Sequence, residues 1–385
     1  MKRSDHRILT THTGSLPRPA DLLAMIDERE AGALHDRAQL ERRIAAAVAE
    51  TVKHEAEIGI DVINDGEMGK VGYSTYPKDR LTGFEGPLAP AGGHLESDVA
   101  DFPGFIQSFL SAQGRPVTGL KRPQCNGPIS YRNRDELEGD LKNFKDALVG
   151  VKAEETFMTA ASPGVIAFFL GNTYYQSHEA YLAALADAMK VEYEAIYRAG
   201  FILQLDCPDL AAGHHVQFSD ARLDGFRRNP ELHIEALNHA VAGIPPERVR
   251  LHLCWGNYEG PHHRDIALAK IIDAVYRARP AGISYEASNP RHEHEWTVFK
   301  DHKLPDGKVL IPGVIDSVSN FIEHPELVAQ RICNLARVVG RENVIAGTDC
   351  GFGTFAGSSA VDPDIAWHKL RALVEGAQIA TGELW

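Results

Sequence analysis

Four side chains with metal-binding chemistry stand at the ends of apolar, strand-like runs of the sequence. His252 and Cys254 are one residue apart in the run Leu-His-Leu-Cys-Trp, and Glu286 and Cys350 end two later runs. Because side chains two residues apart in a strand point to the same face, His252 and Cys254 can both point inward. One imidazole, two thiolates and one carboxylate form a tetrahedral ligand set, and thiolates favour zinc over magnesium, calcium or manganese. The sequence therefore predicts a Zn2+ site formed by these four residues.

Each predicted ligand also has a purely structural interpretation. Free cysteine is commonly buried, and a histidine in a strand is often an ordinary core residue. Alternative ligands that we interpret as solvated loop residues are His214, His215, His262, His263, His292 and His294. The remaining cysteines have no spacing typical of metal ligands; they are Cys125, Cys207 and Cys333.

Two carboxylates occupy similar positions and are candidates for catalysis and substrate binding. Asp206 ends an apolar run immediately before Cys207-Pro208, and Glu67 lies in the run Asn-Asp-Gly-Glu-Met-Gly. A carboxylate at the end of a strand can orient an amine or a hydroxyl of a substrate. For Asp206 the alternative is a cap of the following turn, and the sequence leaves both interpretations open.

Other residues near predicted strand ends are candidates for binding the rest of a substrate. Gly14 and Ser15 offer backbone N–H groups and a hydroxyl that suit a carboxylate, although Gly-Ser-Leu-Pro can also be only a turn. Phe168, Phe169 and Trp255 can stack on a planar donor, but aromatic residues in such positions belong to a core as often as to a binding surface.

Eight short strand-like runs alternate with longer helical patterns, which indicates βαβ units and a parallel sheet. The runs occupy residues 8–13, 61–64, 157–161, 202–206, 250–254, 282–287, 309–315 and 344–348. Helical segments, with apolar residues three and four positions apart, include 38–58, 179–199, 230–241, 266–278 and 325–338. This pattern favours an α/β fold of the (β/α)8 barrel type, in which active sites form at the carboxyl ends of the strands.

Two excursions exceed a minimal barrel. Residues 11–38 contain a Pro-rich turn and a short helical pattern, and residues 73–128 are rich in Gly and Pro. We interpret the second excursion as a lid or hairpin over the C-terminal face of the barrel. No repeat or linker divides the sequence, so we expect a single barrel domain over residues 1–385.

Composition excludes several classes of partner. Lys and Arg total 40 against 53 Asp and Glu, a formal charge of −13, which argues against nucleic acid or anionic membrane as a partner. No apolar run approaches the roughly 18 residues of a membrane span, and the N-terminus does not resemble a signal peptide. Five cysteines are too few for a disulfide framework, so we expect a cytoplasmic protein with free or metal-bound thiols. The sequence does not decide whether the protein is a monomer or a homo-oligomer.

These motifs resemble the cobalamin-independent methionine synthase family, specifically its C-terminal catalytic barrel, within a superfamily shared with uroporphyrinogen decarboxylase. The similarity covers nearly the whole chain. Segments similar to the family's substrate-binding strand ends are Thr10-Thr-His-Thr-Gly-Ser-Leu-Pro-Arg18, Asp65-Gly-Glu67 and Gln204-Leu-Asp206. The family's zinc ligands are matched one by one by His252, Cys254, Glu286 and Cys350.

The resemblance implies a function in which a thiol is activated for alkyl transfer. By this resemblance, Asp206, Glu67 and Ser15 hold the amine and carboxylate of an amino-acid thiol such as homocysteine. A free thiol has a pKa of about 8.5. Coordination to zinc deprotonates the thiol, and the resulting thiolate can attack an electrophilic carbon. The expected enzyme is a zinc-dependent S-methyltransferase of methionine biosynthesis, similar to 5-methyltetrahydropteroyltriglutamate–homocysteine S-methyltransferase, with a small-molecule thiol and an alkyl donor as partners.

Departures from the family pattern bear on the donor. Where the family has a histidine thought to handle the proton for folate, this chain places Val318, and Cys207 and Ala212 replace acidic residues after Asp206. The sequence also has no counterpart of the N-terminal barrel that helps to bind polyglutamated folate. These departures argue against a methylated folate as the methyl donor, and the alternatives are a methylated corrinoid or another methyl carrier.

Alternative functions remain at this stage. Epoxyalkane:coenzyme M transferases open an epoxide with a zinc-bound thiolate, but coenzyme M carries a sulfonate and no amine. It would need a cation where homocysteine needs Asp206 and Glu67, so the two acids favour an amino-acid thiol. A zinc hydrolase is the alternative from another class, although its ligands are usually histidine and carboxylate rather than two thiolates. A purely structural zinc and a metal-free decarboxylase are the remaining alternatives.

Overall fold

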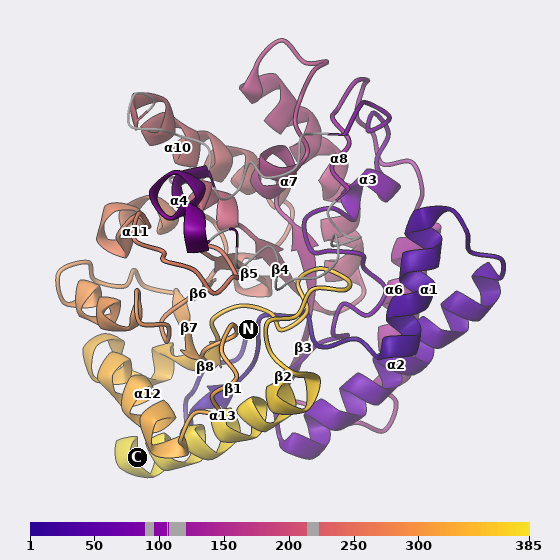
Figure 1. Cartoon of the computed structure of the whole chain (residues 1–385). Helices are drawn as coiled ribbons and strands as arrows, with labels where there is room; N and C mark the ends of the chain where they lie inside the picture. Colours follow the sequence, from indigo (N-terminus) through magenta and orange to yellow (C-terminus); the bar gives the residue numbers. More distant parts are fainter. Residues whose placement is uncertain (89–95, 106, 108–120, 214–222) are drawn as a thin grey trace.

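Eight parallel strands form a barrel at the centre of the computed structural model (Figure 1). They are β1 (Leu9–Thr10), β2 (Val62–Ile63), β3 (Glu155–Ala161), β4 (Ile202–Asp206), β5 (Val249–Leu253), β6 (Gly282–Tyr285), β7 (Val309–Ile315) and β8 (Ile345–Thr348). Neighbouring strands pair in the order β1-β8-β7-β6-β5-β4-β3-β2, and a bridge between Thr11 and Val62 joins the two ends. The structure describes residues 1–88, 96–105, 107, 121–213 and 223–385. The predicted (β/α)8 barrel is confirmed.

Helices surround the strands (Figure 1). The longer ones are α1 (Ala20–Ala31), α2 (Arg37–Ile58), α6 (Asp135–Ala147), α7 (Pro163–Phe169), α8 (His178–Arg198), α10 (Leu223–Ala240), α12 (Pro325–Val339) and α13 (Pro363–Leu384). Shorter ones are α3 (Pro77–Arg80), α4 (Glu96–Asp101) and α11 (Ile272–Val275). Local signals set several ends: the Asp36 carboxylate accepts from the Gln39 N–H at the start of α2, and Gly59 ends that helix with a φ of 94°. Within the described residues, none of these helices has the length and apolar character needed to cross a bilayer.

One predicted helix is wrong in extent. The apolar spacing of residues 266–278 predicts a continuous helix, but the segment forms a 3-10 turn (Leu268–Lys270) followed by the short helix α11. The Glu295 carboxylate accepts a hydrogen bond from the Leu268 N–H at 2.7 Å, and the N–H of Ile271 bonds to Leu268 three residues back. The Glu295 carboxylate therefore caps the start of a 3-10 turn, and only a short α-helix follows. Helix α10 begins before its predicted start and contains Pro230 in its interior.

The two predicted excursions lie where the loops after β1 and β2 leave the barrel. The first contains helix α1, as expected. In the second, helix α4 contacts the loop after β5, because the Tyr258 hydroxyl donates to Asp98 and the side chains of His263 and Arg264 bond to Asp101. The described part of this excursion thus packs against a loop on the C-terminal face; residues 89–95, 106 and 108–120 lie outside the described residues.

A buried ionic cluster ties this excursion to helix α8. Glu192 is fully buried and accepts hydrogen bonds from Tyr76 at 2.5 Å, Tyr131 at 2.6 Å and Arg80 at 3.2 Å. Burial opposes ionisation of Glu192, but the positive charge of Arg80 holds its pKa below the usual value. Arg80 also bonds to Asp140 in α6. The cluster fixes the start of the excursion to the helical layer.

We expect the substitution Glu192→Gln to lower the free energy of unfolding by about 3 kcal/mol, because it leaves Arg80 buried without its principal counter-charge. Urea unfolding followed by circular dichroism measures this. Glu194→Gln is the matched control: this residue lies on the same helix and pairs with Arg198 at the surface, where such a pair contributes about 0.5 kcal/mol or less. Equal shifts for the two variants would contradict the role assigned to the buried cluster.

Candidate metal and substrate site

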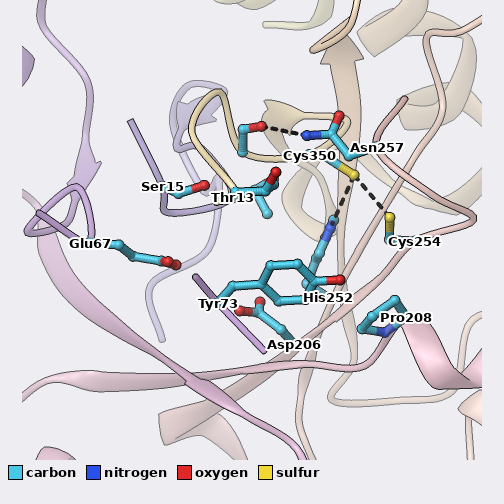
Figure 2. A pocket seen from close by; sticks show the side chains of 12 residues that line it. Thr13, Ser15, Glu67, Tyr73, Asp206, Pro208, His252, Cys254, Asn257 and Cys350 are labelled. Carbon is cyan, nitrogen blue, oxygen red and sulfur yellow. Dashed lines mark hydrogen bonds between the residues drawn. The ribbon is translucent and has the colours of Figure 1, made fainter. Parts of the chain in front are cut away.

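A pocket of about 360 Å3 lies at the carboxyl ends of the strands (Figure 2). Its walls come from the segments that follow β1, β2, β4, β5 and β8, as expected for this fold. The lining residues are Thr13, Ser15, Glu67, Tyr73, Asp206, Pro208, His252, Cys254, Asn257, Cys350, Gly351 and Thr354. Six of the eleven residues proposed from the sequence as ligands or substrate contacts therefore share one cavity: Ser15, Glu67, Asp206, His252, Cys254 and Cys350.

The four predicted metal ligands meet at one side of this pocket. The Cys350 sulfur lies 3.1 Å from the Cys254 sulfur, 3.6 Å from His252 Nε2 and 3.4 Å from Glu286 Oε1. Ligand atoms of His252, Cys254 and Cys350 all lie within 4.8 Å of one another, and the three residues are buried. Figure 2 shows the three side chains pointing toward one another. Because soft sulfur donors and one imidazole converge in a buried place, the set fits zinc.

The protonation of these residues agrees with a site built for a cation. Burial lowers the pKa of His252 to about 3, so its imidazole is neutral and can act as a ligand. Burial raises the pKa of the Cys350 thiol well above its ordinary value. A hydrogen bond from Cys350 lowers the pKa of Cys254, but burial and the charge of Glu286 raise it overall to about 12. Without a cation, two thiols crowded beside a carboxylate resist ionisation, and a bound metal ion removes this obstacle.

Hydrogen bonds behind the ligands fix their orientation. The Ser284 hydroxyl lies 3.1 Å from His252 Nδ1, which leaves Nε2 to face the cysteines. Glu286 accepts from the backbone N–H of Trp255 at 2.8 Å and from the Asn289 amide at 2.8 Å. The ligands are therefore held by groups from neighbouring loops rather than by one another alone.

Asp349, next to Cys350, ties the loop after β8 to the loop that carries Glu286. Its buried carboxylate accepts from the backbone N–H groups of Ala287, Ser288 and Asn289 at 2.8, 3.0 and 3.0 Å, and from the Ser288 hydroxyl at 2.7 Å. Four donors on one carboxylate set the relative position of two ligand-bearing loops.

Asn257 makes a similar link between the loops after β5, β7 and β8. Its amide nitrogen donates to the Gly351 carbonyl at 2.8 Å, and its amide oxygen accepts from the Ser317 hydroxyl at 2.8 Å. That hydroxyl accepts from the Cys350 N–H at 3.2 Å. No pattern of spacing or composition pointed to Asn257, since it follows Cys254 in an irregular loop.

We expect Asp349→Asn to weaken zinc binding by about 10- to 100-fold, because an amide cannot accept all four hydrogen bonds that hold the Glu286 loop. Competition with a fluorescent zinc chelator measures the affinity. Asp362→Asn, which alters the N-terminal cap of α13, is the control and should leave the zinc affinity unchanged. Unchanged zinc affinity in Asp349→Asn would show that the loops hold their positions without this carboxylate.

Glu67 and Asp206 line the same pocket: Glu67 lies across it from Cys254, and Asp206 stands beside His252 on the neighbouring strand (Figure 2). Glu67 Oε1 accepts from the Thr159 hydroxyl at 2.7 Å, whereas its buried Oε2 has no hydrogen-bond partner among the described residues. Asp206 accepts from the Gln204 amide at 2.9 Å, and burial together with the charge of Glu67 raises the pKa of Asp206 to about 8. An unpartnered buried carboxylate oxygen beside a second carboxyl is an arrangement that a ligand cation would stabilise.

The turns that carry these groups are conformationally demanding. Glu67 has a φ of 56°, in the left-handed region that non-glycine residues seldom adopt. A Cβ atom at Gly14 would lie 2.6 Å from the Thr159 side chain, and one at Gly351 would lie 2.0 Å from Ser15 Oγ. The backbone thus approaches Ser15 closely because residues 14 and 351 are glycines, which places the Ser15 hydroxyl on the pocket wall.

The three aromatic residues proposed from the sequence, Phe168, Phe169 and Trp255, are absent from the described pocket wall. The Trp255 side chain is fully buried, donates from its indole N–H to the Ile266 carbonyl at 2.7 Å and packs against His292. Phe169 lies behind Tyr73, with ring centroids 5.8 Å apart. Both are packing residues here, because the loop after β5 turns Trp255 inward and Tyr73 takes the exposed position. Tyr73 itself was missed, since it stands in the irregular excursion.

The alternative histidine ligands have carboxylate partners instead. His262 bonds to Asp265 at 2.8 Å, His263 to Asp101 at 2.8 Å, and His292 to both Asp265 and Glu295. His214 and His215 lie outside the described residues. The loop after β7, where Val318 was predicted to replace a histidine, forms an Asp316-capped turn whose residues are absent from the described pocket wall.

Comparisons with known proteins connect this geometry to a family. A 2-hydroxypropyl-CoM lyase of Xanthobacter autotrophicus is 31% identical over 373 residues, 90% of this chain and 88% of the relative. A methionine synthase of Thermococcus kodakarensis is 27% identical over 97% of this chain and 94% of its own length. The chain belongs to the cobalamin-independent methionine synthase family. The fold agrees: a B12-independent methionine synthase of Shewanella, solved in complex with selenomethionine, superposes with a TM-score of 0.71 at 20% identity, covering 98% of this chain and 99% of that one. No family model matched the sequence.

Proposed function

We propose that this family member is a zinc-dependent thiol alkyltransferase, and specifically an S-methyltransferase that acts on an amino-acid thiol such as homocysteine. The observation that carries the proposal is a single pocket that joins a buried histidine–cysteine–cysteine cluster to a carboxylate pair. His252, Cys254, Glu286 and Cys350 would hold the metal. Zinc, when bound, supplies a positive charge that ionises and orients the acceptor thiol.

The residues of the chain position the acceptor. The free Oε2 of Glu67 and the carboxyl of Asp206 bind its ammonium group, and the Ser15 turn offers a hydroxyl to its carboxylate. With the ammonium and carboxylate held at one end, the acceptor sulfur lies at the end lined by Cys254 and Cys350. Fixing both ends orients the sulfur for attack on the alkyl carbon, which lowers the entropic part of the barrier.

A second candidate is transfer to coenzyme M, because the relative with 31% identity is named a 2-hydroxypropyl-CoM lyase. A sulfonate needs a cation, however, and no lysine or arginine is among the described residues that line the pocket. The carboxylate pair offers a sulfonate no positive charge, and any ionised carboxylate of the pair would repel it at short range. The pocket therefore supports the amino-acid thiol, in agreement with the methionine synthases among the relatives.

X-ray absorption at the zinc edge tests the proposal. Purified protein is measured alone, with homocysteine and with coenzyme M. We expect a sulfur ligand to be added with homocysteine and none with coenzyme M. A spectrum that neither thiol changes would favour a structural zinc. Cleavage of an ester or amide with no thiol present would instead show a zinc hydrolase. Purified protein without bound zinc would refute the metal assignment.

A further inference from the structure

Tyr73 forms part of the pocket wall and is held rigidly. Its backbone N–H donates to the Thr354 carbonyl at 3.1 Å. Its ring packs against Phe169 and Phe355, with centroids 5.8 and 5.3 Å away. The two phenylalanine rings also pack on each other, with centroids 6.1 Å apart, so this aromatic cluster and the backbone hydrogen bond together hold the Tyr73 ring in the pocket wall.

This hydroxyl faces the metal side of the cavity. Figure 2 shows its oxygen directed toward the side where His252 and Cys254 lie, away from Glu67. Burial raises the pKa of Tyr73 well above its ordinary value, so the phenol carries its proton. The hydroxyl therefore points to the side of the pocket where the proposed function places the acceptor sulfur.

Other polar groups on this wall of the pocket already donate hydrogen bonds to neighbouring groups. The Asn257 amide donates to Gly351, and the Thr13 hydroxyl donates to the Thr348 carbonyl at 3.0 Å. Beyond them, the Ser317 hydroxyl donates to Asn257. The hydroxyls of Ser15 and Thr354 are aliphatic alcohols and much weaker acids than a phenol, whose ordinary pKa is about 10. Among the hydroxyl groups of the described lining residues, that of Tyr73 is thus the best placed proton donor, and the Asp206 carboxyl is assigned to the ammonium group of the acceptor.

We propose that the Tyr73 hydroxyl donates a hydrogen bond, and then its proton, to the oxygen or nitrogen atom that leaves the transferred carbon. The inference rests on the proposed alkyl transfer and narrows its donor to molecules with a reactive C–O or C–N bond. The acceptor thiolate provides the electron pair for the new S–C bond. The C–O or C–N bond breaks with its electrons moving to the heteroatom, which takes the Tyr73 proton. The proton that the acceptor thiol loses passes to water, and water returns a proton to Tyr73. The net reaction converts the thiol and the alkyl donor into a thioether and the protonated leaving group.

The test compares donors that differ in whether their leaving group needs a proton. We compare wild type with Tyr73→Phe and with the control Tyr276→Phe. The Tyr276 hydroxyl donates to the His302 carbonyl, and Tyr276 is not among the described residues that line the pocket. Each protein is assayed with homocysteine and three alkyl donors. These are 5-methyltetrahydrofolate (C–N), epoxypropane (C–O) and iodomethane, whose iodide leaves without a proton. Thioether formation is followed by mass spectrometry, and homocysteine binding by zinc-edge absorption.

We expect Tyr73→Phe to bind homocysteine as wild type does. Its kcat/KM should fall by about 10²- to 10⁴-fold with the C–N or C–O donor that wild type accepts, and by less than about threefold with iodomethane. Equal losses with all donors, or no loss with any, would overturn the inference. So would a wild type that alkylates homocysteine with iodomethane but accepts neither of the other two donors. If wild-type zinc binds no thiol, the proposed function itself fails, and the absorption spectrum shows this separately.

Discussion

The substitution Cys350→Ser is expected to remove stable zinc binding and, with it, alkyl transfer. Zinc sites in proteins bind with about 10–16 kcal/mol, so one of four ligands contributes about 3–4 kcal/mol, or several hundredfold in affinity. The loss should be at least this large, because Cys350 is the central residue of the cluster: its sulfur is within 3.6 Å of ligand atoms of His252, Cys254 and Glu286. A chelator competition assay gives the affinity, and metal analysis after dialysis gives the zinc content.

Cys333→Ser is the matched control for this prediction. Cys333 is also a buried free cysteine, but it lies in helix α12 and packs in the core. Its replacement should cost stability through a buried hydroxyl while leaving zinc content unchanged. If Cys350→Ser retains zinc with wild-type affinity, Cys350 is not a ligand. If it loses zinc and also unfolds at 25 °C, the metal has a structural role, which contradicts a site whose purpose is catalysis.

The convergence of the predicted metal ligands could be inferred from the sequence because it depends on where the strands end. His252 lies in β5 and Cys254 follows it directly, and the parallel strands of a barrel bring their carboxyl ends together, which adds Glu286 and Cys350. The same argument brought Asp206 to the pocket. Glu67 was also included because it follows β2, although the strained turn that aims its side chain could not be predicted.

The remaining parts of the site depend on irregular segments, where no period exists to be read. Tyr73 and Asn257 stand in loops, and their orientation comes from contacts with Phe355 and Gly351 that are about 280 and 94 residues away in sequence. Trp255 failed as a predicted contact for the same reason: nothing in the sequence shows that its indole bonds to the Ile266 carbonyl. Apolar spacing likewise could not reveal that the segment 266–278 forms a 3-10 turn, whose first N–H bonds to Glu295, and only a short helix after it.

Asp206→Asn is expected to weaken homocysteine binding by about 10- to 100-fold, since a hydrogen bond to a charged group contributes about 1.5–3 kcal/mol. Binding of 4-mercaptobutanoate, which is homocysteine without its amine, should be unchanged or stronger, because it has no ammonium group to lose a partner. Asp209→Asn is the matched control in the same loop; this aspartate bonds to Ser162 and His233 instead. Isothermal titration with the zinc-loaded protein measures both thiols. Equal losses for the two thiols in Asp206→Asn would mean that the residue supports the pocket and does not recognise the amine.

The pH dependence of homocysteine binding separates two proton releases, one from Asp206 beside the ammonium group and one from the acceptor thiol. Burial and the charge of Glu67 raise the pKa of Asp206 to about 8, so below that pH the free carboxyl is largely protonated. An ammonium ligand favours the ionised form and lowers this pKa, hence binding releases a proton, and homocysteine affinity should rise between pH 6 and 7.5. The thiol also releases a proton on binding, and the pH dependence of 4-mercaptobutanoate binding measures that release alone.

In wild type, we expect the slope of the logarithm of affinity against pH to be larger for homocysteine than for 4-mercaptobutanoate, by up to about one proton. This difference should vanish in Asp206→Asn. Identical slopes for both thiols in wild type would show that no carboxyl ionises with the amine, and would remove the physical basis for an amino-acid acceptor.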